Sequence, residues 1–363
     1  MTSKIVTIDA DSGSSSDMST KNLLASMRSR ERRVELANTR LTRNITVPLW
    51  VMLLVGSSLV YVMPAIANSQ PQVEAILEGL SHPTGVAVDS EGNVYFAEFA
   101  LEGALKRYSV DGSVTVLLSP LTSAAGVAVG VEGEVYVVES AEGVLWRAVS
   151  GLRGAEVVLE EPGIWDLAVD SEGTLYVSVR SVNGSLIKLP HGADRPEVLL
   201  SGLNVPYGIA VDSRGNVYFV EFGSAGAEDG ALKMLPKGQL EPVTLAGGLR
   251  NPYDVAVDDA GRVYFTEKGG TLKVLEPGSD TPKLLLSELG RVYGIAFDRR
   301  GGLILSSFGS PVGEGGDGAL LRLQVPEASW PVEVWLLAVF GLVAFASSLF
   351  FFLRRRGHGR SSG

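Results

Sequence analysis

The sequence predicts an all-β fold, a six-bladed β-propeller whose blades contain four strands each. The main observation is a phrase that occurs six times, most plainly over residues 83–98 as PTGVAVDSEGNVYFAE. The copies place a Gly or an Asp at positions 85, 126, 166, 208, 254 and 294, with spacings of 41, 40, 42, 46 and 40 residues. A period near 40 residues is the length of one four-stranded propeller blade.

Each copy is typical of a hairpin followed by two further strands. In the fourth copy, β-branched and aromatic runs at 208–212 and 216–221 are joined by a Ser-Arg-Gly turn, and further strands are expected at 231–235 and 242–246. A helical solenoid is the alternative for this period, but Gly and Pro interrupt the region too often for long helices.

The last copy supplies only three strands, at 294–297, 302–306 and 319–324. Residues 73–80 (VEAILEGL) precede the first copy and match the fourth strand at 196–203 (PEVLLSGL). We therefore expect the N-terminal strand to complete the last blade, which closes the ring and removes an open strand edge.

Two stretches of 20 residues without a charge, 47–66 and 334–353, flank the repeats, and each is long enough to form a transmembrane helix. Arginines precede the first stretch and follow the second, so both termini are expected in the cytoplasm, with the propeller on the extracytoplasmic side of the cell membrane. The predicted division is a partly disordered basic cytoplasmic tail (1–46), a transmembrane helix (47–67), the propeller (68–325), a linker (326–333), a second transmembrane helix (334–353) and a basic cytoplasmic tail (354–363).

Two alternatives concern processing of these flanking segments. The small-x-small pattern Ala65-Ile66-Ala67 also fits a signal sequence that is cleaved after Ala67. The C-terminal span with its arginine cluster is also similar to the sorting tails that are cut from some surface proteins. In either case the propeller is exported.

The charge of the repeat region limits its partners. Residues 68–331 carry 19 basic and 35 acidic residues, a net charge of −16. Such a domain repels nucleic acid, which is therefore not an expected partner, and attracts cations. The expected partners are the membrane and a protein, carbohydrate or small-molecule ligand. The chain contains no cysteine, which excludes thiol catalysis.

Hairpin geometry predicts which residues surround one mouth of the central channel. The residue before each opening Gly or Asp and the residue 14 positions later, at the end of the second strand, share one face of the ring. The first set supplies the candidate ligand-binding residues Thr84, Trp165, Tyr207, Tyr253 and Tyr293. The second set contains the glutamates Glu98, Glu139, Glu221 and Glu267.

Carboxylates that converge on one mouth repel one another or recruit a hard cation. The four glutamates, together with Asp166 and Asp254 at the opening positions of two copies, are therefore candidate ligands of Ca²⁺ or Mg²⁺. No other cofactor is expected. The alternative is that each glutamate accepts hydrogen bonds from backbone N–H groups at a blade edge, as a fixture of the repeat.

The six copies resemble the NHL-type repeats of six-bladed propellers, and residues 263–267 (VYFTE) are similar to the motif of the virginiamycin B lyase branch, near the SMP-30-like propellers. The resemblance covers residues 72–325 and implies the fold. It implies no single activity, because similar propellers include enzymes, sensors and interaction platforms. The lyase branch relies on a histidine before the opening Gly, paired with a Glu 14 residues later, and this chain has no histidine there.

Two functions remain as hypotheses. One is a membrane-anchored module that binds a ligand, polymer or partner protein at the mouth. The other is a metal-dependent hydrolase, lactonase or lyase in which the four glutamates hold a cation that activates water or polarises the substrate. The absent histidine favours binding, whereas carboxylates at four of six equivalent positions favour metal chemistry.

Overall fold

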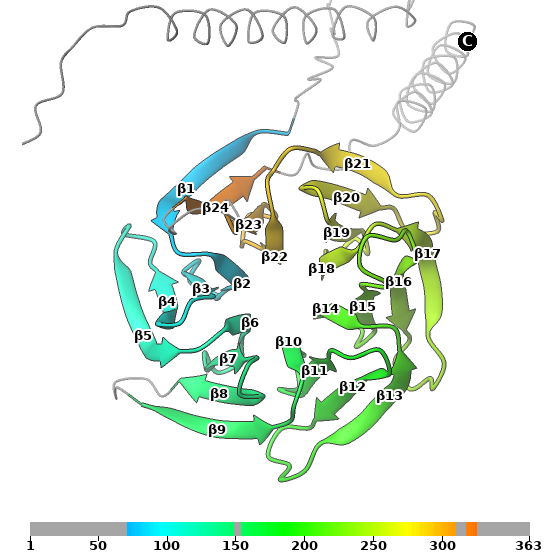
Figure 1. Cartoon of the computed structure of the whole chain (residues 1–363), viewed down its shortest axis with the longest axis horizontal. Coiled ribbons are helices and arrows are strands. Elements are labelled where there is room, and N and C mark those ends of the chain that lie inside the picture. The colour runs from blue at the N-terminus through cyan, green and yellow to red at the C-terminus, as the bar shows by residue number, and fades with distance from the viewer. Residues whose placement is uncertain (1–70, 149–153, 310–316, 325–363) are drawn as a thin grey trace, which may run out of the picture. The chain divides into compact units, whose positions relative to one another are not determined.

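The computed structural model describes residues 71–148, 154–309 and 317–324, which form six four-stranded antiparallel sheets arranged as the blades of a propeller (Figure 1). These residues belong to one compact unit. The predicted all-β six-bladed propeller is confirmed.

Five blades are continuous in sequence, and the first strand of each lies innermost (Figure 1). Blade one contains β2 (Pro83–Val88), β3 (Val94–Glu98), β4 (Gly103–Tyr108) and β5 (Val114–Leu121). Blade two contains β6 (Ala124–Val129), β7 (Val135–Glu139), β8 (Val144–Ala148) and β9 (Ala155–Glu160). Blade three contains β10 (Ile164–Val169), β11 (Leu175–Val179), β12 (Gly184–Leu189) and β13 (Glu197–Leu203). Blade four contains β14 (Pro206–Val211), β15 (Val217–Glu221), β16 (Gly230–Leu235) and β17 (Val243–Leu249), and blade five contains β18 (Pro252–Val257), β19 (Val263–Glu267), β20 (Thr271–Leu275) and β21 (Lys283–Leu286).

The sixth blade joins the two ends of the propeller. It contains β22 (Val292–Phe297), β23 (Leu303–Ser307), β24 (Gly318–Leu323) and, as its outer strand, β1 (Val73–Leu80). Strand β1 pairs antiparallel with β24, with Val73 opposite Leu323 and Leu80 opposite Gly318. The closure predicted from the similarity of residues 73–80 to a fourth strand is confirmed.

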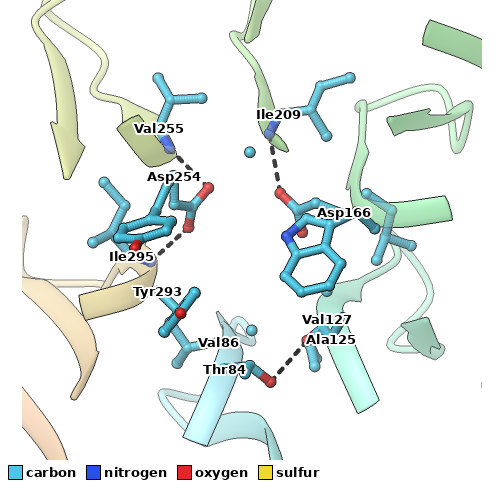
Figure 2. A pocket seen from close by; sticks show the side chains of 16 residues that line it. Thr84, Val86, Ala125, Val127, Asp166, Ile209, Asp254, Val255, Tyr293 and Ile295 are labelled. Carbon is cyan, nitrogen blue, oxygen red and sulfur yellow. Dashed lines mark hydrogen bonds between the residues drawn. The ribbon is translucent and has the colours of Figure 1, made fainter. Parts of the chain in front are cut away.

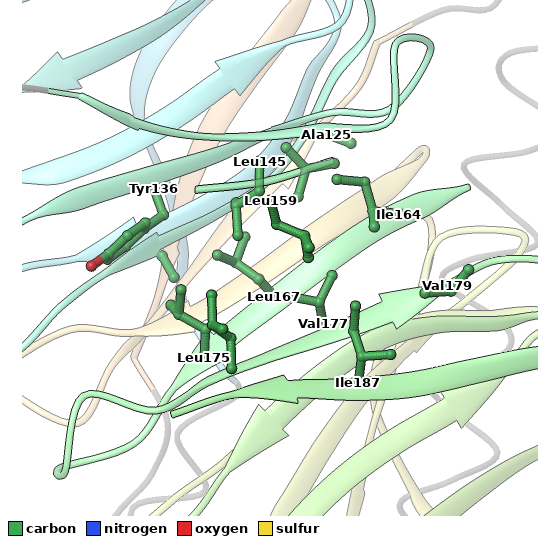
Figure 3. Packing of buried hydrophobic residues seen from close by; sticks show 13 residues of the cluster. Ala125, Tyr136, Leu145, Leu159, Ile164, Leu167, Leu175, Val177, Val179 and Ile187 are labelled. Atoms are coloured by element: carbon green, nitrogen blue, oxygen red, sulfur yellow. The ribbon is translucent and has the colours of Figure 1, made fainter. Parts of the chain in front are cut away.

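The hydrophobic core is divided among the interfaces between blades. Among the described residues, buried apolar side chains form six clusters, one between each pair of neighbouring blades. Figure 3 shows the cluster in which Leu145 and Leu159 of blade two pack against Ile164 and Val177 of blade three. Burial of one such side chain stabilises the fold by about 1.5–3 kcal/mol, so each blade depends on its two neighbours.

The innermost strands approach one another too closely for most side chains at the opening position. A Cβ atom added to Gly85 would lie 2.3 Å from the carbonyl oxygen of Ala125, and one added to Gly208 would lie 2.4 Å from the Cα of Asp254. Glycine at this position therefore permits neighbouring blades to pack. Asp166 and Asp254 stand at the same position in blades three and five, and each accepts a backbone N–H from the next blade.

Nothing in the described part of the chain is a helix long and apolar enough to cross a membrane. Both predicted spans, 47–66 and 334–353, lie outside the described residues, as do the predicted tails.

Candidate functional site: an aromatic mouth of the channel

One end of each inner hairpin faces the mouth of the channel and is held by the same backbone hydrogen bond in all six blades. The residue after the second strand donates its N–H to the carbonyl of a residue just before the first strand, at N···O distances of 2.7 to 3.1 Å. This bond brings together three residues per blade, which we call the mouth positions. The connector residues are His82, Ser123, Gly163, Val205, Asn251 and Arg291. The second residues of the first strands are Thr84, Ala125, Trp165, Tyr207, Tyr253 and Tyr293. The residues after the second strands are Phe99, Ser140, Arg180, Phe222, Lys268 and Phe308.

Six aromatic rings at these positions form a closed circuit, the aromatic belt. Its members are Phe99, Trp165, Tyr207, Tyr253, Tyr293 and Phe308. Successive ring centroids are 6.4, 5.1, 6.0, 4.5, 4.9 and 6.4 Å apart around the circuit, which is the range of favourable aromatic pairs. Tyr253 is buried and the other five are half-buried, so the belt keeps part of its surface open to a ligand.

Phe222 and a buried asparagine support the belt in blades four and five. The ring of Phe222 stacks on Tyr207 with centroids 4.7 Å apart. Asn251, which is fully buried, donates its side-chain N–H groups to the carbonyls of Phe222 and Ser224 at 3.0 and 2.8 Å and accepts the N–H of Gly226. This amide therefore holds the loop after β15 in place beside the belt.

Arg180 lies on the belt as a fixed cation. Its guanidinium carbon is 4.0 Å from the centroid of Trp165 and 5.4 Å from that of Tyr207, and its Nη1 donates to the Tyr207 hydroxyl at 3.1 Å. Burial raises the pKa of Tyr207 although Arg180 opposes the shift, and burial also raises the pKa of Tyr253. The hydroxyls of Tyr207 and Tyr253 are therefore neutral at physiological pH and can donate as well as accept hydrogen bonds.

A cavity of about 60 Å³ lies at the centre of the propeller, lined by the first strands of the blades and by Trp165, Tyr253 and Tyr293 of the belt (Figure 2). This volume holds a few water molecules but not a sugar ring. A larger ligand could therefore contact the belt only from its outer side.

Asp166 and Asp254 line this cavity, and each joins two blades. The Oδ2 atom of Asp166 accepts the N–H of Ile209 in blade four at 3.0 Å, and that of Asp254 accepts the N–H of Ile295 in blade six at 2.7 Å (Figure 2). Burial raises the pKa of Asp166 to about 7. Burial, followed by the charge of Asp166, raises that of Asp254 well above its ordinary value.

The four predicted metal-binding glutamates are buried at 4 to 7% exposure, and the structure engages each of them within its own blade. Glu98, Glu221 and Glu267 lie 2.6, 2.8 and 2.7 Å from the ammonium groups of Lys106, Lys233 and Lys273 on the third strand. Glu139 instead accepts the indole N–H of Trp146 at 2.8 Å.

The other carboxylate oxygen of each glutamate accepts a backbone N–H from the residue that directly precedes the connector residue. These donors are Ser81, Thr122, Asn204 and Arg250. Each of these carboxylates therefore already has a cationic or indole partner within its own blade. In the described residues no group of three or more His, Asp or Glu is placed to hold a metal ion. The glutamates do not fit a Ca²⁺ or Mg²⁺ site, and metal binding by this protein stays a prediction.

The predicted ligand-binding residues have two different placements. Trp165, Tyr207, Tyr253 and Tyr293 form four consecutive members of the belt. Thr84 is buried, and its hydroxyl donates to the carbonyl of Ala124 at 2.8 Å, so it joins blades one and two.

Phe99, Arg180, Phe222 and Phe308 lie at the mouth but were not predicted from the sequence. These residues directly follow the second strand, one position beyond the predicted glutamates in the repeat. Side chains of successive residues along a strand point to opposite sides. The glutamate at the end of the second strand therefore pairs within its blade, whereas the side chain of the next residue lies at the mouth.

Comparison with solved structures agrees with the fold. A gluconolactonase from Xanthomonas campestris matches with a TM-score of 0.59 at 16% identity, over 73% of this chain and 93% of that one. The calcium-binding protein regucalcin from Agrobacterium tumefaciens matches with a TM-score of 0.56 at 15% identity, over 69% and 92% of the chains. A streptogramin B lyase matches with a TM-score of 0.50 at 14% identity, over 70% and 98%.

The chain is thus a six-bladed propeller similar to the SMP-30/gluconolactonase, regucalcin and streptogramin B lyase structures. No protein-family model matches it, and no curated protein matches it significantly. At these identities the likeness concerns the fold alone.

Proposed function

We propose that this propeller is a binding module that takes a saccharide on the aromatic belt. The observation that carries the proposal is the closed circuit of six rings around one mouth, five of them half-buried. Trp165 and Tyr207 also pack against the cores between blades, but none of the core clusters in the described residues includes Phe99, Tyr253, Tyr293 or Phe308. Packing between the blades therefore does not account for the whole circuit. Aromatic rings offer a flat apolar face, and neighbouring tyrosine hydroxyls offer hydrogen bonds.

A saccharide suits these two properties together. The C–H face of a pyranose stacks on an aromatic ring, while its hydroxyls need nearby donors and acceptors such as Tyr207 and Tyr293. The small central cavity directs such a ligand to the outer side of the belt. The gluconolactonase with a similar structure is described as acting in glucose secondary metabolic pathways, which supports sugar chemistry on this fold without assigning it here.

The test is binding of oligosaccharides to the full chain, measured by calorimetry for the wild type and two Trp→Ala variants. Trp165→Ala removes a belt ring and is expected to weaken binding at least about 10-fold, as loss of a central aromatic contact does. Trp146→Ala is the matched control, because its indole bonds to Glu139 within a blade. The control is expected to lower the melting temperature and leave the affinity unchanged. Equal affinities in all three proteins would contradict the proposal.

A lactonase or other hydrolase is the second candidate, and the two carboxyls in the cavity favour it. Asp166 and Asp254 are the carboxyls of the cavity wall, and a carboxyl with a raised pKa is suited to proton transfer. If this function holds, sugar lactones are turned over, and Asp166→Asn with Asp254→Asn abolishes turnover. Saccharide binding without turnover favours the binding module.

We also propose that the flanking apolar segments hold the propeller at the outer face of the cell membrane, with both termini in the cytoplasm. The arginines beside both segments support this orientation. Protease added to intact cells is then expected to digest the propeller and spare an N-terminal tag. Loss of the tag from outside contradicts the topology, and a mature N-terminus after Ala67 identifies a cleaved signal sequence.

A further inference from the structure

The mouth positions carry a charge opposite to that of the rest of the propeller. The 18 residues at these positions include Arg180, Lys268 and Arg291 and no Asp or Glu, although residues 68–331 carry a net charge of −16. Carboxylates of the same face lie further out, in loops and connectors, at Glu102, Glu142, Glu161, Glu228 and Glu288. The centre of the mouth is thus cationic and its surroundings are acidic.

The three mouth cations have no carboxylate partner among the described residues, a property that they share with other cations such as Arg214 and Arg299. Nine ion pairs between Lys or Arg and Asp or Glu join side chains in the described residues, and none includes Arg180, Lys268 or Arg291. All three are exposed. In a domain with 35 acidic residues, three exposed cations without any carboxylate at the mouth positions favour the binding of a negative group there.

Arg180 is the best placed of the three to recognise such a group. Its contacts with Trp165 and Tyr207 fix the guanidinium plane on the belt, and the bond to the Tyr207 hydroxyl uses one nitrogen. No further hydrogen bond of this guanidinium to a described residue is present, so N–H groups remain for a planar oxyanion. A pre-ordered guanidinium binds a carboxylate or sulfate with two hydrogen bonds and little further loss of side-chain entropy.

We infer that the belt binds an acidic saccharide, with Arg180 receiving a carboxylate or sulfate group while a sugar ring stacks on the aromatic side chains. This inference rests on the saccharide-binding function proposed above. An acidic peptide is less suited, because the inner strands that form the mouth are already paired within their blades and offer no strand edge for backbone hydrogen bonds.

The test compares four probes on the full chain by calorimetry: a neutral oligosaccharide, an oligogalacturonate, a sulfated oligosaccharide of the same length, and oligoglutamate. The acidic saccharides are expected to bind at least about 10-fold more tightly than the neutral one at low salt, with a smaller difference at high salt because ions screen exposed charges. The two acidic probes distinguish a carboxylate from a sulfate as the recognised group.

Variants separate recognition of the charge from recognition of the sugar ring. Arg180→Gln is expected to remove the preference, so that the ratio of the affinities for acidic and neutral saccharides falls to about one. The control is Lys237→Gln, which removes an exposed cation that pairs with Glu172 away from the mouth; this variant is expected to keep the preference.

Each contrary result has a distinct meaning. Equal binding of neutral and acidic saccharides overturns the inference and leaves the saccharide-binding function standing. Binding of oligoglutamate as tight as that of oligogalacturonate overturns the assignment to saccharides. Absence of binding to every saccharide overturns the proposed function and this inference with it.

Discussion

The first and second strands of each blade form an inner hairpin, and its two ends differ in how much the residue type changes from blade to blade. At the turn end, five of the six blades place an Asp at the end of the first strand: Asp89, Asp170, Asp212, Asp258 and Asp298. At the mouth end, the equivalent positions hold residues as different as Phe, Ser, Arg and Lys. The backbone hydrogen bonds are alike at both ends, so we infer that the fold depends more on the turn side chains than on the mouth side chains.

The turn in blade one shows why the aspartate recurs. Oδ1 of Asp89 accepts the N–H groups of Glu91 and Asn93 at 2.8 and 2.9 Å, and Oδ2 accepts the Asn93 amide and the Tyr95 hydroxyl at 2.8 and 3.0 Å. One carboxylate thus satisfies four donors around a tight turn. In blade two Gly130 takes this position, and Glu134 accepts the N–H of Glu132 at 3.0 Å.

The largest effect is therefore expected at the turn end. Asp89→Ala leaves four donors without their acceptor, and we expect a loss of about 2–4 kcal/mol in the free energy of unfolding. The melting temperature should fall by roughly 5–10 °C. Asp111→Ala is the matched control, since this exposed aspartate bonds only to Ser113 in another turn, and it should change the free energy by less than about 0.5 kcal/mol. Similar melting temperatures for both variants would contradict the distinction.

The same turn predicts a pH dependence. Burial alone would raise the pKa of Asp89, but hydrogen bonds from Asn93, Tyr95 and Glu91 outweigh it and lower the pKa below 3.8. The stabilisation by the carboxylate is therefore present above pH 4 and is lost as the pH falls through the folded-state pKa. Acid denaturation of Asp89→Ala should show a weaker dependence on pH in this range than that of the wild type.

A second effect is expected at the buried glutamates, at the boundary between the blade and the mouth. Glu221→Gln breaks the ion pair with Lys233 and leaves that ammonium partly buried without a counterion. We expect a loss of about 1–3 kcal/mol, and a double-mutant cycle with Lys233→Met should recover part of it.

This experiment also distinguishes the roles considered for the glutamates. If they hold a divalent cation, Ca²⁺ raises the wild-type melting temperature by mass action, and Glu221→Gln with Glu267→Gln removes that response. The ion pairs lead us to expect destabilisation by the substitutions with no specific response to Ca²⁺. If Ca²⁺ raises the melting temperature of the wild type and not that of the double variant, the glutamates are metal ligands.

The sequence was sufficient for the fold because each repeat carries its own strand and turn signals, and the similarity of 73–80 to 196–203 was sufficient for the closure. Four belt residues could also be predicted, since Trp165, Tyr207, Tyr253 and Tyr293 share one position of the repeat. The partners of the glutamates could not be predicted. Glu98, Glu221 and Glu267 are followed by their lysines after 8, 12 and 6 residues, because the loop between the second and third strands varies in length. The pairing register of the second and third strands places each lysine beside its glutamate, and this register cannot be read from the spacing of the residues in the sequence.

A third and smaller effect concerns the cavity beneath the belt. Because the pKa of Asp166 is raised from 3.8 to about 7, the folded protein keeps a proton that the unfolded chain releases, and this contribution to stability declines as the pH rises from 4 to 7. Asp166→Asn with Asp254→Asn keeps an acceptor oxygen and removes the buried charges. The double variant should therefore gain stability relative to the wild type as the pH rises, by about 1 kcal/mol or more at pH 8. A constant difference in melting temperature from pH 4.5 to pH 8 would show that these carboxyls do not titrate as expected.

The smallest effect on stability is expected at the mouth itself. Lys268 and Arg291 are exposed and form no ion pair with a described carboxylate, so Lys268→Gln and Arg291→Gln should each change the free energy of unfolding by less than about 0.5 kcal/mol. Their backbone hydrogen bonds at the end of the hairpin do not depend on the side chain. If the mouth end is free of folding constraints, thermal denaturation of both variants should match the wild type while their affinity for an acidic oligosaccharide falls. A drop in melting temperature comparable to that of Asp89→Ala would mean that the mouth residues are also required by the fold, and the contrast between the two ends of the hairpin would be lost.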